Sequence, residues 1–438
     1  MAVTQEQLRH SDQTIDLTHP PGHTGSSPAP RSKLGRDYLK LWLATAVSNI
    51  GDGVRITALP LLAATITRDP LAIAGLMFAG KLPWLLLSLH AGAIADRVDR
   101  RKLIVGINIL RALAMGALGI FLVTGMESIA LLYSVALLQG VGEVFSDNAA
   151  FALMPSIVPK DRLEDANGRL EAAVVVTNEF AGPALGGLLF AVAAAAPFLV
   201  DGGSFLLAGV LIASISYRPP IRLEEPEKTR LRDDIAEGVR WLRNHKVLRD
   251  LSLIAAVTNL MLFATFSIQV LFALEVLGLT SAGFGLLLSA EAFGALFGSL
   301  LAGKLKRSMG TRGAIVLALA VASGANIAIA TSSSWILVGA MAIATSFAGG
   351  LWNVMTNSLR QSLVPDRLLG RVQSAHRLLS WGAIPLGSVL GGVLAAAFTL
   401  HVPFMVAGLV LAAMTGTVWG LLRGSEGHPA GSPSAPVA

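Results

Sequence analysis

The sequence contains no cysteine and few charged residues, and both deficits exclude classes of protein. Without cysteine there is no disulfide framework, no thiol nucleophile and no zinc site with cysteine ligands. Only 14% of the 438 residues are charged and 53% are apolar, whereas a soluble domain contains roughly a quarter charged residues. The phosphate-binding loop motif of an ATP-driven pump is absent, and the eight histidines show no metal-ligand spacing. The composition therefore predicts a membrane protein that is not an enzyme and uses no cofactor or metal.

Apolar runs of about 20 residues, the length that crosses the hydrocarbon core of a bilayer, recur from Tyr38 onward. Short polar segments separate these runs. We expect an all-α membrane protein with twelve transmembrane helices, over residues 38–67, 71–95, 102–125, 128–154, 166–190, 197–217, 249–275, 281–303, 313–332, 334–358, 368–396 and 401–422.

Lysine and arginine are distributed unevenly between the two sides of the expected helices. Of the 34 basic residues, 29 lie on one side, four lie inside expected spans, and only Arg68 lies on the other side. Because basic loops stay in the cytoplasm, we expect both termini on the cytoplasmic side of the inner (plasma) membrane. The asymmetry also makes the net charge of +6 a topology signal, so we expect no nucleic acid as a partner.

The longest polar segment between expected spans, residues 218–248, divides the chain into two halves of six spans each. Apolar residues repeat on one helical face within it, which predicts an amphipathic helix on the membrane surface. That face consists of Leu231, Ile235, Val239 and Leu242. The ends of the chain are polar and rich in proline, serine and glycine, which predicts disorder. The expected domains are the cytoplasmic tails 1–37 and 423–438, the bundles 38–217 and 249–422, and the linker 218–248.

The two halves resemble each other in sequence. The segment SIVPKDRLEDANGRL in the first half is echoed by SLVPDRLLGRV in the second, and each joins the fourth helix of its half to the fifth. Pro183 follows Arg169 by 14 residues, and Pro385 follows Arg371 by 14 residues, each proline in a glycine-rich helix. The matched spacing predicts two pseudo-symmetric six-helix halves, a plan that many transporters use.

The segment GAIADRVDRRK, between the second and third expected spans, resembles the loop signature of the major facilitator superfamily, and the resemblance extends over about residues 38–422. Asp99 stands where the signature usually has glycine. The matching residues are Gly92, Asp96, Arg97, Arg100 and Arg101. The resemblance implies that these residues gate the conformational change. A carboxylate at the cytoplasmic rim can cap a helix of the other half, and the arginines can pair with Asp147 on the fourth span.

The segment GPALGG resembles the core of the fifth-span signature of antiporter-type exporters. Asn178 stands at the position of an earlier glycine of that signature. The residues Gly182, Pro183, Gly186 and Gly187 are therefore predicted to bend the helix and to form a close contact with another helix.

Three more segments, SNIGDGVRITALPL, FSDNAAFALMPSIVP and VDGGSF, resemble the branch of macrolide efflux pumps and the enterobactin exporter. Many drug–proton antiporters carry a fourth-span arginine where this chain has Ala136, so proton coupling must use other groups.

Charged side chains inside the expected spans are costly in lipid and are therefore functional candidates. Asp52 and Arg55 lie three residues apart on one face of the first span, and Arg111 lies near the middle of the third. Because burial disfavours the charged form of a carboxyl group, a buried acid can take up a proton on one side and release it on the other. The candidates for proton coupling are Asp52, Glu143 and Glu179, with Arg111 as the counter-charge. Static ion pairs that fix the helix register are the structural alternative.

Polar and bulky residues on apolar helices are candidates for the lining of a substrate cavity. The candidates are Asn49, Arg55, Phe266, Asn353 and Asn357. We expect secondary active efflux of small, largely hydrophobic compounds, such as drugs, macrolides or siderophores, by alternating access and proton antiport. The expected partners are a small-molecule substrate, protons and the lipid bilayer, and we expect a monomer. Two alternatives stay open: a facilitator or importer of a small metabolite without proton coupling, and a non-transporting membrane sensor.

Overall fold

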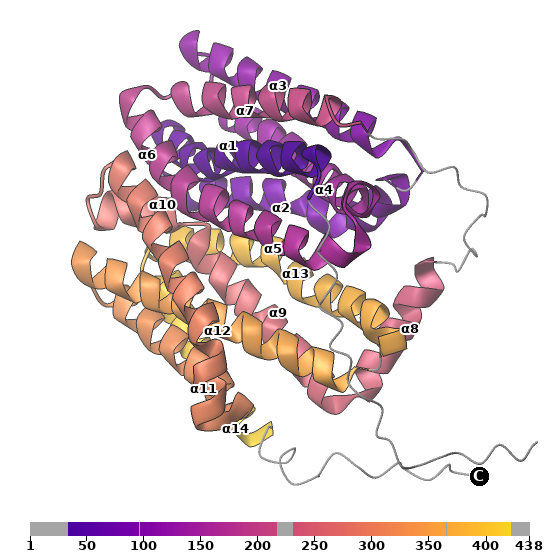
Figure 1. Cartoon of the computed structure of the whole chain (residues 1–438). Coiled ribbons are helices and arrows are strands. Elements are labelled where there is room, and N and C mark those ends of the chain that lie inside the picture. Colours follow the sequence, from indigo (N-terminus) through magenta and orange to yellow (C-terminus); the bar gives the residue numbers. More distant parts are fainter. Residues whose placement is uncertain (1–33, 96, 217–230, 365, 422–438) are drawn as a thin grey trace, which may run out of the picture. The chain divides into compact units, whose positions relative to one another are not determined.

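The structure is a computed structural model that describes residues 34–95, 97–216, 231–364 and 366–421, and almost all of them are helical (Figure 1). A helix satisfies its backbone N–H and C=O groups within one segment, which a lipid environment demands of an apolar chain. Most of the expected tails, residue 217 and residues 218–230 of the expected linker lie outside the described residues. The α-helices are α1 Arg36–Ile66, α2 Pro70–Ala95, α3 Arg100–Val123, α4 Ile129–Ile157, α5 Leu163–Val174, α6 Gly182–Val192, α7 Ala196–Ala213, α8 Leu231–Asn244, α9 Lys246–Phe266, α10 Gln269–Leu271, α11 Ser281–Ala330, α12 Trp335–Leu363, α13 Asp366–Ala397 and α14 Val402–Leu421.

Ten helical segments of the described residues are long and apolar enough to cross a membrane. The expected first span corresponds to α1, a helix of 31 residues that is not one of the ten, and two expected spans fall within α11. A straight helix of the 50 residues of α11 would be about 75 Å long, more than twice the ~30 Å hydrocarbon core. Gly310 interrupts α11 with a φ of 74°, a left-handed conformation that favours glycine. The break divides α11 into two segments.

Local signals in the sequence set several helix starts. The hydroxyl of Ser128 accepts a hydrogen bond from a backbone N–H in the first turn of α4, and the hydroxyl of Thr280 does the same for α11. Asp99 accepts from the backbone N–H of Lys102 at 3.1 Å and so caps the N-terminus of α3. The capping role gives a physical reason for an aspartate at the position where the superfamily signature usually has glycine.

The helix that carries GPALGG is irregular immediately before this segment. Residues Val175–Ala181 form a π-helical segment, η2, and the backbone N–H of Gly182 bonds to the carbonyl of Thr177, five residues back. Pro183 at the start of α6 has no N–H to donate. The disturbance expected at the proline therefore takes the form of a widened helical turn N-terminal to it. Such π-helical turns are rare and are frequently found at functional sites.

The glycines of α6 allow close contact with two other helices. A Cβ atom added to Gly186 would lie 3.0 Å from the Cα of Val54 on α1. A Cβ atom added to Gly187 would lie 3.1 Å from the Cα of Gly285 on α11. Both distances are shorter than normal carbon–carbon contacts. One face of α6 therefore packs against α1, and the neighbouring face packs against a helix of the second half of the chain.

The proline-containing helix α13 packs in a corresponding way. A Cβ atom added to Gly387 would lie 3.0 Å from the Cα of Leu260 on α9, and one added to Gly392 would lie 3.0 Å from the Cα of Leu71 on α2. Thus α6 contacts α1 and α11, and α13 contacts α9 and α2. The contacts of α6 with α11 and of α13 with α2 lie where α1 ends and where α2 and α11 begin. We refer to this end of the helices as the closed end.

The amphipathic helix expected in the linker is present as α8. Leu242, one of the four apolar residues of its predicted face, is buried in a cluster that includes Leu248 on α9 and Leu368 and Val372 on α13. Val239 is 37% exposed. The C-terminal turn of α8 is therefore held by helices of the second half.

Candidate functional site

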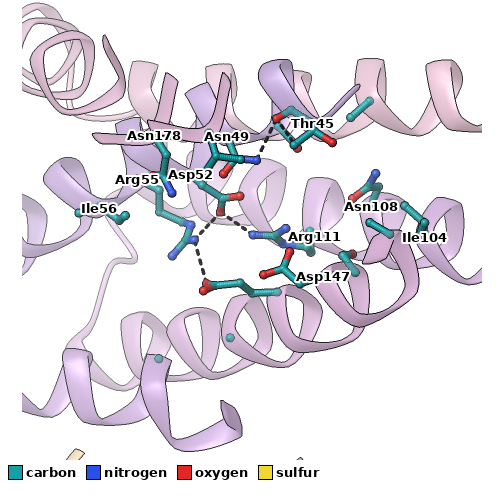
Figure 2. Close-up of a pocket in the computed structure, with 18 of the residues that line it drawn as sticks. Thr45, Asn49, Asp52, Arg55, Ile56, Ile104, Asn108, Arg111, Asp147 and Asn178 are labelled. Atoms are coloured by element: carbon teal, nitrogen blue, oxygen red, sulfur yellow. Dashed lines mark hydrogen bonds and ion pairs between the residues drawn. The ribbon is translucent and has the colours of Figure 1, made fainter. Parts of the chain in front are cut away.

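A cavity of about 590 Å³ lies among the helices of the first half of the chain (Figure 2). Residues of α1, α2, α3, α4, α5, η2 and α7 line it, and Phe263 and Phe266 on α9 contribute from the second half. The lining extends from the middle of the helices to Leu41 near the start of α1 and to Met154 near the end of α4. These positions lie at the opposite end of the helices from the closed end, and we refer to this side as the cavity end.

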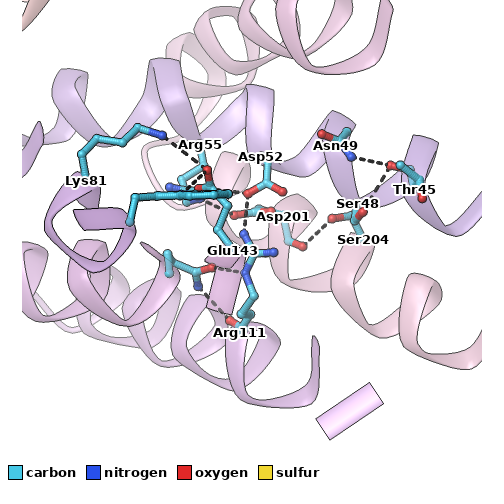
Figure 3. A network of polar contacts seen from close by, with 12 residues as sticks. Thr45, Ser48, Asn49, Asp52, Arg55, Lys81, Arg111, Glu143, Asp201 and Ser204 are labelled. Atoms are coloured by element: carbon cyan, nitrogen blue, oxygen red, sulfur yellow. Dashed lines mark hydrogen bonds and ion pairs between the residues drawn. The ribbon is translucent and has the colours of Figure 1, made fainter. Parts of the chain in front are cut away.

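Asp52 on α1 joins two arginines in the wall of the cavity (Figure 3). Its Oδ1 accepts from the Nη2 of Arg55, three residues along the same helix, at 2.5 Å. The same oxygen accepts from the Nη2 of Arg111 on α3, also at 2.5 Å. All three residues are at most 9% exposed. Because charge-assisted bonds are strong and both arginines share one carboxylate, a change in the charge of Asp52 acts on α1 and α3 together.

Arg111 is held by polar and aromatic contacts in addition to Asp52. Its Nε donates to the Oε1 of Gln139 on α4 at 2.8 Å, and the Nε2 of Gln139 donates back to the Arg111 carbonyl at 3.1 Å. Its guanidinium lies 3.9 Å from the centre of the Phe205 ring on α7. Gly142 leaves room for the arginine, since an added Cβ would lie 2.6 Å from the Arg111 Cδ. The arginine expected to act as a counter-charge therefore connects α1, α3, α4 and α7.

Glu143 on α4 accepts from two side chains of α2. The Nζ of Lys81 lies 3.3 Å from its Oε1, and the Nε1 of Trp84 donates to the same oxygen at 3.1 Å. Its Oε2 lies 3.9 Å from the Nη2 of Arg55. The structure thus brings together three of the four residues predicted for proton coupling, together with Arg55 and Lys81.

Asp201 on α7 is a member of this site that the sequence analysis did not single out. It is fully buried, and its Oδ2 lies 3.5 Å from the Nε of Arg55. Within the described residues, neither of its carboxylate oxygens has a hydrogen-bond donor. The available signal was an acid inside the apolar segment VDGGSF, close to the start of the expected sixth span. We refer to Asp52, Arg55, Lys81, Arg111, Glu143 and Asp201 as the charge network.

Glu179, the remaining predicted coupling acid, lies elsewhere. It belongs to the π-helical segment η2, it is exposed, and it does not line the cavity. Its neighbour Asn178 lines the cavity instead. In the part of the chain that the structure describes, no hydrogen bond or ion pair joins Glu179 to another residue.

The residues predicted to line a substrate cavity fall into two groups. Asn49, Arg55 and Phe266 line the cavity, and the side-chain amide of Asn49 donates to a backbone carbonyl of its own helix at 2.9 Å. Asn353 and Asn357 lie on α12, where both are exposed and outside the cavity lining. Hydropathy along the chain cannot distinguish these two groups, because the face that a helix turns inward depends on its neighbours.

The residues of the loop signature between α2 and α3 hold the ends of neighbouring helices. Arg100 donates to the carbonyl of Ala152 on α4 at 2.6 Å, and Arg101 donates to the carbonyl of Ile215, just beyond α7, at 2.8 Å. Arg97 is exposed. Gly92 lies within α2, where an added Cβ would make an ordinary contact with α4. Asp96 lies outside the described residues.

The structure places Asp147 in a different setting from the one expected. The prediction paired it with the arginines of the loop signature, but Arg100 reaches α4 beyond it, at Ala152 and Ser156. The side chain of Asp147 is exposed and lines the cavity beside Arg111 (Figure 2). The physical reason is the helical period, since Asp147 and Glu143 lie four residues apart and share one face of α4.

The four predicted residues of GPALGG lie in the helix contacts described above. An added Cβ on Gly182 would lie 2.5 Å from the Cα of Gly53, so Gly182 packs against α1 together with Gly186. The carbonyl of Pro183 and the backbone of Gly187 face Gly285 on α11. The segment therefore contacts α1 through one face and the second half of the chain through the other.

These features together define a class of protein. Helices long enough to cross a membrane surround a cavity that contains a buried charge network. This combination is typical of a membrane transporter rather than of an enzyme. The family model described as transmembrane secretion effector (MFS_3) matches residues 29–425. The chain therefore belongs to this family and is a transporter of the major facilitator superfamily.

Two relatives that are named as efflux proteins match most of the chain. The multidrug efflux pump Tap of Mycolicibacterium fortuitum is 28% identical over 382 residues, which cover 84% of this chain and 91% of the relative. Macrolide efflux protein A of Streptococcus pyogenes is 24% identical over 384 residues, covering 85% and 93%. Among solved structures, an inward-facing bacterial homologue of the iron transporter ferroportin is similar in fold, with a TM-score of 0.67 at 19% identity over 89% of this chain and 100% of that one.

Proposed function

We propose that the chain is a secondary active exporter of small, largely hydrophobic compounds that exchanges protons for its substrate. The observation that carries the proposal is the position of Asp52, which bonds two arginines from different helices in the wall of a cavity of about 590 Å³. The names of the two relatives, a multidrug pump and a macrolide efflux protein, support export of compounds of this kind.

In the proposed arrangement, twelve transmembrane helices form two six-helix halves. The ten membrane-length segments, α1 and the second segment of α11 together account for twelve crossings. The corresponding contacts of α6 and α13 support two related halves. The excess of basic residues in alternate loops supports cytoplasmic termini in the inner membrane. A single chain would be the transport unit.

The contacts between the halves support an inward-facing state. Gly187 meets Gly285, and Gly392 meets Leu71, at the closed end. Arg68 lies 3.4 Å from Glu275 at the same end. With cytoplasmic termini, the closed end is the outer one and the cavity end is the cytoplasmic one. The ferroportin homologue has a TM-score of 0.67 in its inward-facing state and 0.60 in its outward-facing state, which agrees with this assignment.

Proton exchange would act through the bonds of Asp52. The charge network contains three acids and three bases, so it is neutral when every group is ionised. A proton on Asp52 removes one negative charge and weakens the bonds to Arg55 and Arg111 at once. The middle parts of α1 and α3 are then less tightly joined, which favours rearrangement of the two halves. Loss of the proton on the cytoplasmic side restores both bonds.

The test uses the purified protein in proteoliposomes with an imposed pH gradient and an uncharged fluorescent hydrophobic compound. We expect transport to follow the gradient in the natural protein and to become independent of it in Asp52→Asn, which preserves side-chain volume. Glu127→Gln removes an acid from the exposed turn between α3 and α4 and is the matched control. Glu179→Gln is expected to stay coupled, because Glu179 lies outside the cavity lining.

Gradient-independent transport by the natural protein would refute proton antiport and favour the facilitator alternative. Intact coupling in Asp52→Asn would refute the role given to Asp52. Binding of the compound without any transport would favour the sensor alternative. The three outcomes are separated by measuring binding, transport and gradient dependence on the same preparation.

A further inference from the structure

One face of α4 presents three cavity-lining side chains at intervals of one turn. Glu143, Asp147 and Phe151 lie four residues apart and all line the cavity. Residues at this spacing are neighbours on a helix surface. The row begins in the charge network at Glu143 and runs towards the cavity end of the helix. A substrate that enters from the cavity end would therefore meet Phe151 and Asp147 before it reaches the charge network.

Asp147 differs from Glu143, the other acid of the row, because it has no hydrogen bond or ion pair of its own. In the described part of the chain, no hydrogen bond or ion pair joins it to another residue, and its side chain is exposed to the cavity. Glu143, one turn away, is held by Lys81 and Trp84. An ionised carboxylate that faces a largely apolar cavity and has no ion pair of its own favours a cationic ligand.

The bases around the cavity are already matched to acids. Arg55 contacts the carboxylates of Asp52 and Asp201, Arg111 contacts Asp52, and Lys81 contacts Glu143. The cavity lining contains four acids and three bases, which leaves one excess negative charge when all are ionised. These acids and bases are Asp52, Glu143, Asp147, Glu171, Arg55, Lys81 and Arg111. The cavity therefore favours cations over anions of the same shape.

Aromatic rings lie beside the unpaired carboxylate and on the second half of the chain. Phe151 lines the cavity and is 79% exposed, so its ring is accessible to a ligand. Phe263 and Phe266 on α9 line the same cavity, with ring centres 6.1 Å apart. Aromatic faces attract cations and also offer apolar surface to the rest of a ligand.

We propose that Asp147 and Phe151 form the subsite that binds the positively charged group of an amphiphilic cation, with the apolar part of the ligand against Phe263 and Phe266. The proposal rests on the proposed export function and specifies its substrate class. Asp147 pairs with the cationic centre, and Phe151 contacts it through the ring face. Neutral hydrophobic compounds would use the aromatic contacts alone and would bind more weakly.

The test compares two ions of nearly the same shape and opposite charge, tetraphenylphosphonium and tetraphenylborate. Binding of each to the purified full-length protein is measured in separate calorimetric titrations. We expect the phosphonium ion to bind about tenfold or more tightly than the borate. We expect Asp147→Asn to weaken phosphonium binding by about tenfold and to leave borate binding unchanged or stronger. Asp147→Glu should retain most of the phosphonium affinity, because it keeps the charge on the same face of α4.

Two further variants control for net charge and for folding. Glu127→Gln removes one negative charge outside the cavity and should leave both affinities unchanged. Phe151→Ala should weaken phosphonium binding several-fold without changing the preference between the ions. Size-exclusion chromatography and thermal unfolding show whether each variant is folded. If Asp147→Asn does not fold, the phosphonium affinity of Asp147→Glu still tests the subsite.

Equal binding of the two ions, or unchanged phosphonium affinity in Asp147→Asn, would overturn the subsite. The gradient-driven transport of an uncharged compound tests the proposed function separately. Persistent transport of that compound together with loss of ion discrimination would refute the subsite alone. Selective, Asp147-dependent binding without any gradient-driven transport would refute proton-coupled export and leave the binding site in place.

Discussion

Addition of a single methyl group at Gly187 should weaken the closed end. In Gly187→Ala, the new Cβ would lie 3.1 Å from the Cα and backbone N of Gly285 and still closer to the carbonyl oxygen of Ser281. Carbon atoms in normal contact are about 3.5–4.0 Å apart, so α6 and α11 must separate. Overpacking of this kind costs about 1–3 kcal/mol. Because separation of the halves relieves the clash, we expect the equilibrium between the closed and open states of this end to shift about 5- to 150-fold.

The absence of cysteine makes the shift measurable with a single introduced thiol. Ala74 on α2 is fully buried, and an added Cβ on Gly392 of α13 would lie 2.7 Å from its side chain. In Ala74→Cys, a membrane-impermeant maleimide can therefore react only when α2 and α13 separate. We expect Gly187→Ala to increase the labelling rate of this thiol by the same factor, because α6 and α13 contact opposite halves at the same end.

Two matched glycine substitutions distinguish separation of the halves from general loss of stability. Gly186→Ala creates a clash with Val54 on α1, within the first half, and should lower the midpoint of thermal unfolding without faster labelling. Gly203→Ala on α7 places its Cβ in open space and should not reduce stability. Equal labelling rates in Gly187→Ala and Gly203→Ala would refute the assignment of Gly187 to the contact that closes this end.

Further substitutions test the charge network and the break in α11 by thermal and denaturant unfolding in detergent. Arg55→Ala should lower the free energy of unfolding by about 3–5 kcal/mol, because it leaves the buried carboxylate of Asp201 without a base and removes one of the two bases that contact Asp52. Asp201→Asn should cost only about 1 kcal/mol, since the Arg55 guanidinium keeps its bond to Asp52; a larger loss than for Arg55→Ala would contradict the network. Arg111→Lys should cost about 1–3 kcal/mol, because an ammonium group cannot reproduce the fork of guanidinium contacts. Gly310→Ala should cost about 1–3 kcal/mol, because φ is 74° and ψ is 170° there, a conformation that is essentially restricted to glycine, and an unchanged midpoint would argue against that conformation.

The predictions that depended on a local sequence pattern agree with the structure more closely than those that depended on which side chains contact each other across helices. Apolar run length predicted helices throughout the chain, and the amphipathic face in the linker predicted α8. The mid-span charges Asp52, Arg55, Arg111 and Glu143 were identified as unusual because a charge in an apolar run is visible in one dimension. Glu179 satisfied the same criterion, yet it lies on an exposed face, because run length does not report helix rotation.

The sequence alone therefore determined the membrane class, the helical segments, the family and most of the charged residues of the site. It could not determine which charges meet, because Asp52 and Arg111 are 59 residues apart and Lys81 and Glu143 are 62 residues apart in the chain. Only the tertiary structure decided that Asp201 completes the network, that Asp147 faces the cavity without a partner, and that Gly186 and Gly187 contact different halves. Each of these facts depends on the rotation of one helix against another, and side-chain packing between helices fixes that rotation.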